Sequence, residues 1–218
     1  DMDAAQTEVS EATRTATFTP GRDAARKEAS KLNVPRIGVR FRLPASMNQV
    51  EYFGRGPAEN YLDRNAGSMV GLYKSTAEEL YFPYVRPQEN GHHTDTRWVS
   101  LSTGKKGLLI QADNTIGFNA LRNSIEDFDD EEATGLSRQW SNFTPEQVAN
   151  HDEAAAKNVL RRQHHINNIT PRDFVEVCVD LKQQGVAGYD SWGSRPEPAY
   201  TLPANREYNW GFTLIPLK

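Results

Sequence analysis

The clearest structural signal in the chain is the stretch Arg-Ile-Gly-Val-Arg-Phe-Arg-Leu at residues 36–43. Its apolar side chains stand at every second position and alternate with glycine and arginine. Successive side chains of a β-strand point to opposite faces, so a period of two predicts a strand with one buried face.

Short stretches rich in apolar, aromatic and β-branched residues occur on both sides of this strand. We expect further strands at residues 12–19, 50–53, 69–73, 81–85, 97–101, 107–112, 116–121, 174–181 and 207–215. Turn residues separate most of them, notably Pro44-Ala45-Ser46, Thr103-Gly104 and Asp113-Asn114. Many short strands without alternating helices predict an all-β fold, a large antiparallel β-sandwich.

One segment departs from the strand pattern. Thr144-Pro145-Glu146-Gln147 combines an N-cap threonine, a first-turn proline and a glutamine at the third helical position, which predicts the start of one short helix. We divide the 218 residues into a boundary region at 1–33, formed by an edge strand and a charged loop, and a single β domain at 34–218.

The composition narrows the range of partners. The net charge is −4 and the basic residues are scattered, so we expect no nucleic acid. No apolar run approaches the roughly 20 residues that cross a bilayer, and residues 1–19 do not resemble a signal peptide, so we expect a soluble chain without a membrane partner. Cys178 is the single cysteine and should be a small buried hydrophobe.

A loop of small residues near the end of the chain carries one large aromatic. Residues 185–193 contain three glycines and an alanine around Trp192. Local sequence favours a tryptophan that closes the end of the β core. The alternative is a tryptophan that presents its flat face to a sugar ring from an exposed loop.

Two histidine pairs and one acidic run could each be either a chemical site or an ordinary part of the structure. His92-His93 follow Glu89 and could form a metal or acid-base cluster, but adjacent strand residues point to opposite faces, which favours a surface turn. For His164-His165 a structural role is favoured as well. The acidic run at 126–132 lacks the glycine turn and final glutamate of a calcium loop, which favours a solvated loop. No phosphate loop, nucleophile elbow or zinc-type cysteine spacing occurs, so motifs alone indicate a non-catalytic domain without a metal site.

Four stretches then occur in a recognisable order. Residues 54–64 read Gly-Arg-Gly-Pro-Ala-Glu-Asn-Tyr-Leu-Asp-Arg, and residues 84–91 read Tyr-Val-Arg-Pro-Gln-Glu-Asn-Gly. The third stretch is the helix start at residues 143–147, Phe-Thr-Pro-Glu-Gln. The fourth, residues 180–193, begins with Asp-Leu-Lys and ends with Asp-Ser-Trp-Gly. This set resembles the C-terminal domain of the large, multidomain β-galactosidases of glycoside hydrolase family 2. The family commonly reads Gly-Val-Gly-Gly-Asp-x-Ser-Trp in the last stretch, where this chain has Ala187 and Tyr189.

The resemblance implies part of a galactose-mutarotase-like supersandwich. The catalytic glutamates of that family lie on a separate TIM barrel, so we expect this chain alone to be inactive on β-D-galactosides. Trp192 would stack on the aglycone of the substrate, with Tyr189, Asp190 and Ser191 beside it.

The resemblance also implies the partners. These are a galactoside, bound through its aglycone, the other domains of the same polypeptide, and further copies in a homo-oligomer. It implies no cofactor in this chain, Mg and Na or K ions held by other domains, and a bacterial cytoplasm or periplasm. Two alternatives stay open: an independent carbohydrate-binding module, and an aldose epimerase-like domain that uses His92 and Glu89.

Overall fold

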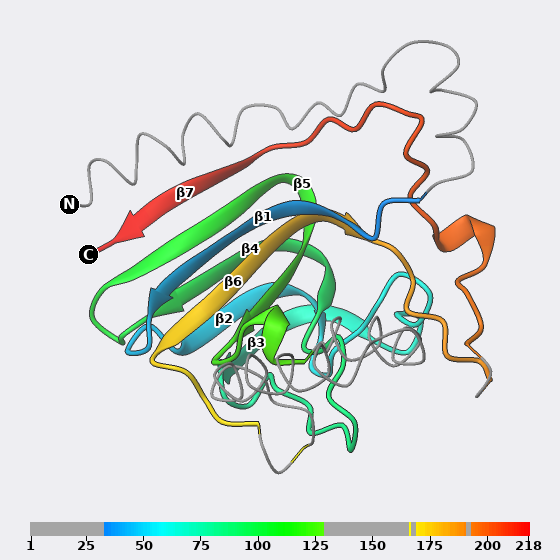
Figure 1. Cartoon of the computed structure of the whole chain (residues 1–218). Coiled ribbons are helices and arrows are strands. Elements are labelled where there is room, and N and C mark those ends of the chain that lie inside the picture. The colour runs from blue at the N-terminus through cyan, green and yellow to red at the C-terminus, as the bar shows by residue number, and fades with distance from the viewer. Residues whose placement is uncertain (1–32, 129–165, 167–168, 191–192) are drawn as a thin grey trace, which may run out of the picture.

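The computed structural model describes residues 33–128, 166, 169–190 and 193–218 (Figure 1). The strand expected at 12–19, the helix expected after Thr144 and the pair His164-His165 lie outside these residues. The described part contains no helix with the length and apolar character needed to cross a membrane.

The described residues form an antiparallel β fold, which confirms the predicted fold class. The strands are β1 (Arg36–Pro44), β2 (Gln49–Gly56), β3 (Met69–Thr76), β4 (His93–Ser102), β5 (Gly107–Leu121), β6 (Phe174–Gln183) and β7 (Phe212–Leu217). The described residues also include two short 3-10 helices, η1 (Ile125–Asp127) and η5 (Pro198–Tyr200). The sheet order is β1-β6-β5-β4-β2-β3, and β7 also pairs with β5.

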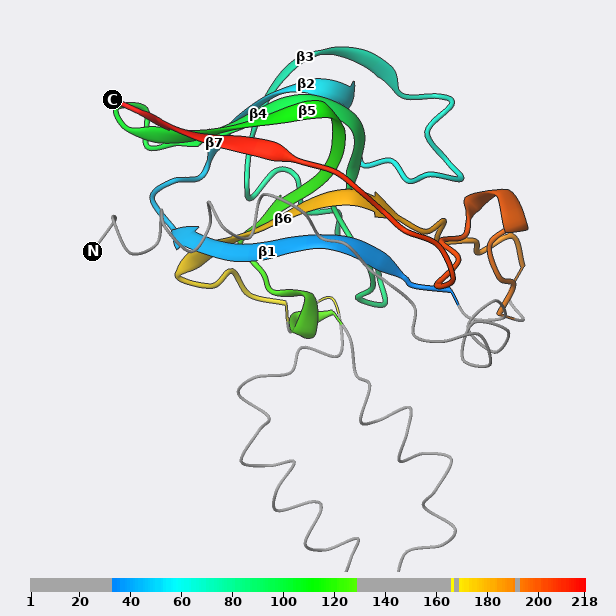
Figure 2. The ribbon, with the colours of Figure 1, turned by 90° about the horizontal axis from the view of Figure 1, so that it is seen from above.

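These strands belong to one sheet that bends along β5. Strand β7 pairs with the first part of β5 and β6 pairs with Gly117–Leu121, while β4 pairs with both parts, from Gly107 to Phe118. The pairing of β4 with β5 shifts register on both sides of Thr96: between Thr96 and Trp98 the extra residues lie on β5 and form a bulge, whereas between His93 and Thr96 the extra residue lies on β4. Figure 2 shows β5 curving from the layer of β2, β3, β4 and β7 into the layer of β1 and β6.

The core lies between these two layers. Its buried side chains are Val50, Tyr52, Ala77, Leu80, Val99, Leu101, Ile110, Ile116, Phe118, Ala120, Leu121, Val175, Val177, Val179 and Phe212. In β1 the predicted alternation appears directly, because its apolar positions are half-buried and the intervening ones from Gly38 on are exposed. Strand β6 is buried on both faces, and Cys178 on its non-core face is 3% exposed, as predicted.

Three strand predictions need correction. Residues 81–85 form no strand, because the side chain of Asn90 bonds both the backbone N–H and the carbonyl of Phe82 in place of a neighbouring strand. Asp113-Asn114 is not a turn but part of the bulge of β5. The last strand begins at Phe212 rather than at residue 207.

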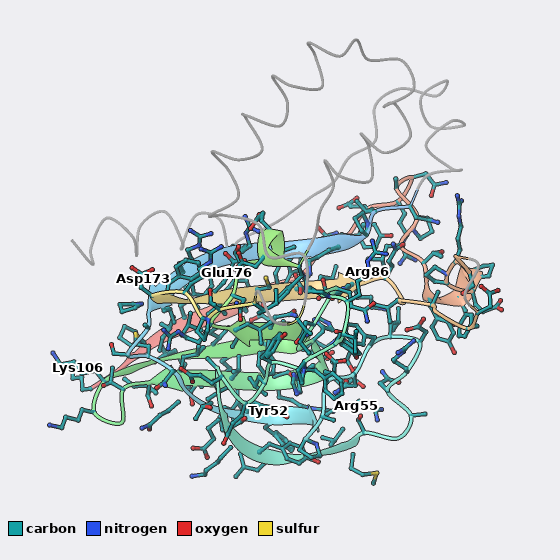
Figure 3. The ribbon with its side chains drawn as sticks, turned by 60° about the horizontal axis from the view of Figure 1, so that its bottom comes forward. Tyr52, Arg55, Arg86, Lys106, Asp173 and Glu176 are labelled. Atoms are coloured by element: carbon teal, nitrogen blue, oxygen red, sulfur yellow. The ribbon has the colours of Figure 1, made fainter. Side chains whose placement is uncertain are left out.

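The recognised motifs gather at one of the two ends of the sheet. Figure 3 shows Lys106, in the β4–β5 hairpin, and Asp173, just before β6, at one end, with Arg55 and Arg86 toward the other. Strands β2 and β6 finish at the second end, and β1 and β4 begin there. The loops that follow or precede these strands carry three of the four recognised motifs.

Candidate functional site

The loop after β2 is fixed to the sheet by Asn60, which is fully buried. Its Nδ2 donates to the carbonyl oxygens of Arg55 and Ala58, both at 3.1 Å. Its Oδ1 accepts from the backbone N–H of Thr94 at 3.0 Å and from the Thr94 hydroxyl at 2.6 Å. The backbone N–H of Asn60 also donates to His92 O at 2.7 Å. Every polar group of this buried amide therefore has a partner, which holds the loop in one position.

Glu59 joins this loop to the second motif. One carboxylate oxygen accepts from the Tyr61 hydroxyl at 3.1 Å and from the backbone N–H of Gly91 at 2.7 Å. The other oxygen accepts from the hydroxyl of Tyr84. Gly91 has a φ of 69°, a left-handed conformation that suits glycine. The two motifs therefore fold as one unit.

The same loop also anchors the small-residue loop after β6. The carboxylate of Asp63 accepts from the backbone N–H groups of Val186 at 3.1 Å and Ala187 at 2.8 Å. Arg64 Nη2 donates to the carbonyl oxygen of Ala187 at 2.5 Å. Ala187 has a φ of 53°, a conformation that is strained for a residue with a side chain. The first and last motifs are thus in direct contact.

Past this anchor the chain forms a short closed loop. The backbone N–H of Tyr189 donates to Ser194 Oγ at 3.0 Å, and the N–H of Ser194 donates to Asp190 Oδ1 at 3.3 Å. Tyr189 is 58% exposed, and its hydroxyl lies 3.4 Å from an Asp63 oxygen. Ser191 and Trp192 lie outside the described residues, between the bonded positions 190 and 194.

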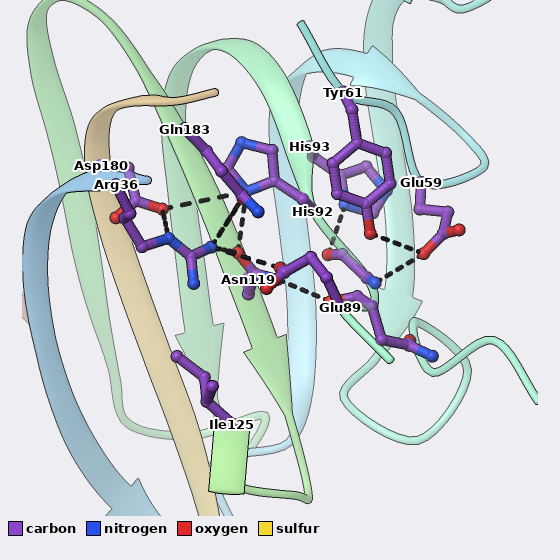
Figure 4. Close-up of polar contacts among 12 residues, drawn as sticks. Arg36, Glu59, Tyr61, Glu89, His92, His93, Asn119, Ile125, Asp180 and Gln183 are labelled. Atoms are coloured by element: carbon purple, nitrogen blue, oxygen red, sulfur yellow. Dashed lines mark hydrogen bonds and ion pairs between the residues drawn. The ribbon is translucent and has the colours of Figure 1, made fainter. Parts of the chain in front are cut away.

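A polar cluster lies under these loops, on the face of β5 and β6 opposite the core (Figure 4). Arg36 Nη2 donates to Asn119 Oδ1 at 2.6 Å and to Gln183 Oε1 at 2.9 Å. Asn119 Nδ2 donates to Glu89 Oε1 at 3.2 Å. Because Asn119 Oδ1 can only accept, His92 donates to it from Nδ1 at 2.8 Å, which fixes the neutral histidine tautomer.

Burial decides the charge states in this cluster. Burial, followed by the nearby Arg36 guanidinium, lowers the pKa of His92 to about 3. Burial also raises the pKa of Asp180 to about 7, although Arg36 pulls it the other way. Arg36 Nε and Asp180 Oδ2 are 3.0 Å apart, but the pair lacks hydrogen-bond alignment and both Asp180 oxygens have no hydrogen-bond partner among the described residues. The imidazole of His92 is therefore uncharged at neutral pH.

The prediction that His92-His93 form a surface turn is wrong, since they are 1% and 0% exposed. The prediction that they point to opposite faces is confirmed. His93 stacks on Phe118 in the core, with ring centroids 5.1 Å apart, whereas His92 faces the polar cluster. Glu89 and His92 share the cluster but meet through Asn119 rather than directly.

The described part of the acidic run is only partly solvated, because Glu126 is exposed whereas Asp127 is buried. Asp127 is 1% exposed, forms an ion pair with Arg172 and accepts from the backbone N–H of Ser124 at 2.9 Å. Glu126 pairs with Arg40 at 2.6 Å. Residues 129–132 lie outside the described residues. Within the described ranges, no group of three or more histidine, cysteine or acidic side chains could hold a metal ion.

Asn60, Asp63 and Arg64 lie in a motif recognised from the sequence, but their roles were not predicted. Arg36 and Asn119 were not among the predicted site residues. Their roles depend on contacts between distant segments; Arg64 and Ala187, for instance, are 123 residues apart. One signal for this contact was present in the sequence: Ala187 stands where the family commonly has glycine. An alanine at such a position needs a specific anchor to hold its backbone.

The fold and these loops define an antiparallel β domain with an anchored aromatic loop at one end of its sheet. The chain belongs to the β-galactosidase small-chain family, whose model matches residues 3–214. It is 35% identical to a β-galactosidase of Priestia megaterium over 185 residues, which are 84% of this chain and 15% of that protein. It is 42% identical to a β-galactosidase of Arthrobacter sp. over 99 residues, 43% of this chain and 10% of the relative. A β-galactosidase of Vibrio cholerae is 29% identical over 83% of this chain and 14% of its own length. The chain thus spans about a seventh of the first and third of these relatives.

Proposed function

We propose that this chain is the non-catalytic C-terminal domain of a β-galactosidase that hydrolyses terminal β-D-galactosides. In this proposal the loop 185–193 contributes Trp192 to the subsite for the aglycone. The observation that carries it is the double anchor of this loop: Asp63 and Arg64 hold the backbone of Ala187 on both sides, while Tyr189 beyond it stays exposed.

An anchored loop suits a binding role better than a core-closing role. Ala187 is buried and fixed, whereas Gly188, Tyr189 and Asp190 are exposed, so the chain becomes exposed directly after its anchor. Stacking of an aromatic ring adds about 0.5–1.5 kcal/mol beyond area burial, by analogy with aromatic pairs. Such an energy would tune binding of the acceptor rather than supply the chemistry.

The chemistry would reside in other parts of the polypeptide. A glycosidase needs two carboxyl groups across the scissile bond, with room for the sugar between them. In the described site, Glu59 accepts three hydrogen bonds and Asp180 is 1% exposed beside Arg36. The cavity between Glu89, Cys178 and Glu176 is too small for a sugar. The Mg and Na or K ions implied by the resemblance would likewise be held elsewhere.

A second surface supports packing against further domains or copies of the chain. Phe53, Val70 and Leu72, with neighbouring Met69, lie on or near the edge strand β3 and are 38%, 40%, 59% and 71% exposed. Phe53 and Leu72 pair across β2 and β3 on the face away from the core. By strand alternation Val70 lies on this face too, whereas Met69 lies on the other. Exposed apolar side chains that share one face of an edge hairpin are typical of surfaces that another domain covers.

The two alternatives receive less support. An aldose epimerase would need His92 in contact with the sugar, yet this side chain is 1% exposed and its pKa is lowered to about 3. An independent carbohydrate-binding module would use Tyr189 and Trp192 as its platform, and the exposure of Tyr189 suits both this alternative and the main proposal.

Two measurements on the chain alone separate these functions. We expect no turnover of a nitrophenyl galactoside, and turnover that persists through purification would overturn the non-catalytic role. We expect tryptophan fluorescence to respond to galactosides only at very high concentration. Saturation at micromolar sugar would identify an independent binding module instead.

A further inference from the structure

We propose that β3 pairs with β3 of a second copy of this chain, edge to edge and antiparallel, with Leu72 of each copy at the two-fold axis. The proposal names the partner of the apolar surface on the β2–β3 hairpin, so it rests on the packing role proposed for that surface. Strand β3 is the last in the sheet order and lies at the margin of its layer, beyond β2 (Figure 2). Among the described strands it pairs with β2 alone, so its second edge offers backbone N–H and C=O groups to a further strand.

The backbone of β3 is suited to such pairing. All eight residues of Met69–Thr76 pair with residues of β2 without a register shift. The strand contains no proline and no bulge, two features that keep further strands away from an edge. Its one charged side chain, Lys74, forms an ion pair with Glu51 of β2 at 3.2 Å, which compensates the charge. The strand therefore lacks most of the devices by which edge strands avoid pairing.

The outer face of the hairpin indicates the register. Trp98 of β4, Phe53 of β2 and Leu72 of β3 stand opposite one another across three strands. Phe53 and Leu72 are 38% and 59% exposed. Side chains that stand directly opposite on neighbouring strands pack against each other. A two-fold axis at Leu72 would place this leucine against its own copy and continue the apolar row from Trp98 of one chain to Trp98 of the other.

The charges on this face also fit a second copy. In the proposed register Val70 lies opposite Lys74 of the second copy, so no like charges stand directly opposite each other. Strand β2 places Glu51 beside Lys74 and Arg55 beside Val70. Each row that flanks the apolar row would therefore run from the glutamate and lysine of one chain to the arginine of the other. A shift of the axis by one residue along β3 would set Lys74 against Leu72 and interrupt the apolar row. The surface is complementary to itself in the proposed register, as a two-fold contact requires.

The oligomeric state of the 218-residue chain tests the proposal, measured by sedimentation equilibrium over a range of concentrations. The contact of two short edges is small, and small interfaces form reversible rather than permanent complexes. We expect a dimer whose fraction rises with concentration. A chain that stays monomeric up to about 1 mM would overturn the proposal.

Two variants locate the contact on the surface. Leu72→Lys would place two like charges opposite each other at the axis, so we expect it to raise the dissociation constant at least about tenfold. The matched control is Leu217→Lys, because Leu217 is also an exposed leucine, 38%, on a strand that pairs on one side with β5. It should keep the dissociation constant of the parent. A dimer that Leu217→Lys dissociates and Leu72→Lys leaves intact would use another edge and contradict the proposal. Urea unfolding in dilute solution checks that both variants are folded.

Disulfide cross-linking tests the register. Opposite residues of antiparallel strands have Cα atoms about 4.5–5.5 Å apart, within the range of about 4.4–6.8 Å that a disulfide spans. The native Cys178 is buried. We expect Leu72→Cys to form a covalent dimer under mild oxidation. Lys74→Cys should not, because the two copies of residue 74 would lie roughly 14 Å apart. Cross-linking of Lys74→Cys in preference to Leu72→Cys would place the axis elsewhere and refute the register.

The same two lysine variants in the full-length polypeptide separate this inference from the packing role on which it rests. If the 218-residue chain is monomeric but Leu72→Lys lowers the urea midpoint of the full-length polypeptide more than Leu217→Lys does, another domain covers the surface. The inference then fails while the packing role stands. If Leu72→Lys changes neither the oligomeric state of the chain nor the stability of the full-length polypeptide, both fail.

Discussion

Arg36 Nε lies 3.0 Å from Oδ2 of Asp180, and this pair joins β1 to β6 on the face opposite the core. The carboxylate is 1% exposed, while the arginine side chain keeps 18% exposure and extends to Asn119 and Gln183. Asp180 depends on Arg36 for compensation of its charge, because its oxygens have no hydrogen-bond partner in the described residues.

Removal of the cation should therefore destabilise the fold. Above about pH 7, where Asp180 is ionised in the parent, Arg36→Met leaves a buried carboxylate without its partner, which typically costs about 3–5 kcal/mol. Lys74→Met, which removes one member of the exposed pair with Glu51, should cost at most about 1 kcal/mol. Equilibrium unfolding in urea measures both. Equal midpoints for the two variants would show that the buried pair contributes nothing.

The pH dependence of stability should contain opposite contributions from Asp180 and His92. The folded pKa of Asp180, about 7, exceeds its ordinary 3.8, so this carboxyl stabilises the fold at low pH and loses that effect as the pH rises through about 7. The folded pKa of His92, about 3, lies below its ordinary 6.5, so its contribution is present above pH 6.5 and is lost as the pH falls. Burial lowers the pKa of His93 as well, and this acts in the same sense.

Asp180→Asn removes the first contribution and leaves the histidines. We expect the variant to lose stability more steeply than the parent between about pH 6.5 and 4, measured as the urea midpoint at each pH. Curves with equal slopes would mean that the carboxyl of Asp180 keeps its ordinary pKa in the folded chain.

Gly38 on β1 tests how closely this strand packs against β6, and Gly67, in an open loop, is the matched control. A Cβ atom at Gly38 would lie 1.9 Å from Asp180 Oδ1 and 2.6 Å from Val179 O, whereas one at Gly67 would meet nothing within 4 Å. Gly38→Ala should cost about 1–3 kcal/mol through overpacking. Gly67→Ala should change stability by less than about 1 kcal/mol. Thermal or urea unfolding compares them, and similar stabilities would contradict the close approach of β1 to Asp180.

Cys178 should be unreactive in the folded chain. The residue is 3% exposed, and burial raises the pKa of its thiol to about 12. At about pH 8, where a free cysteine with a pKa near 8.5 is partly ionised, a disulfide reagent should label it only as fast as the protein opens. Denaturing urea should make labelling immediate. Rapid labelling under native conditions would show that the face of β6 under η1 is open to solvent.

The sequence predicted the strands with one clearly buried face, because alternation reports burial directly. It failed where an apolar run is satisfied locally, as at residues 81–85, whose Phe82 bonds Asn90 instead of a strand. It also failed at Asp113-Asn114, where turn-forming residues bend one strand rather than reverse the chain.

The site was only partly predictable for a related reason. The loop with Trp192 was found because small residues around a tryptophan are conspicuous, and the motif with Asp63 was found by resemblance. Their contact depends on how β2 and β6 end at the same side of the sheet, which periodicity does not reveal. The burial of His92 likewise follows from Tyr61 stacking above it and Gly117 leaving room beside it.

The central claim is that Trp192 binds the aglycone while another part of the polypeptide performs hydrolysis. The most direct measurement compares Trp192→Ala and Trp192→Phe in the full-length polypeptide, using the KM for a disaccharide and the inhibition constant of galactose. We expect the alanine variant to weaken disaccharide binding by about 2- to 12-fold with little change for galactose, and the phenylalanine variant to keep most of the affinity. Equal losses for the disaccharide and galactose, or no loss for either, would contradict the account.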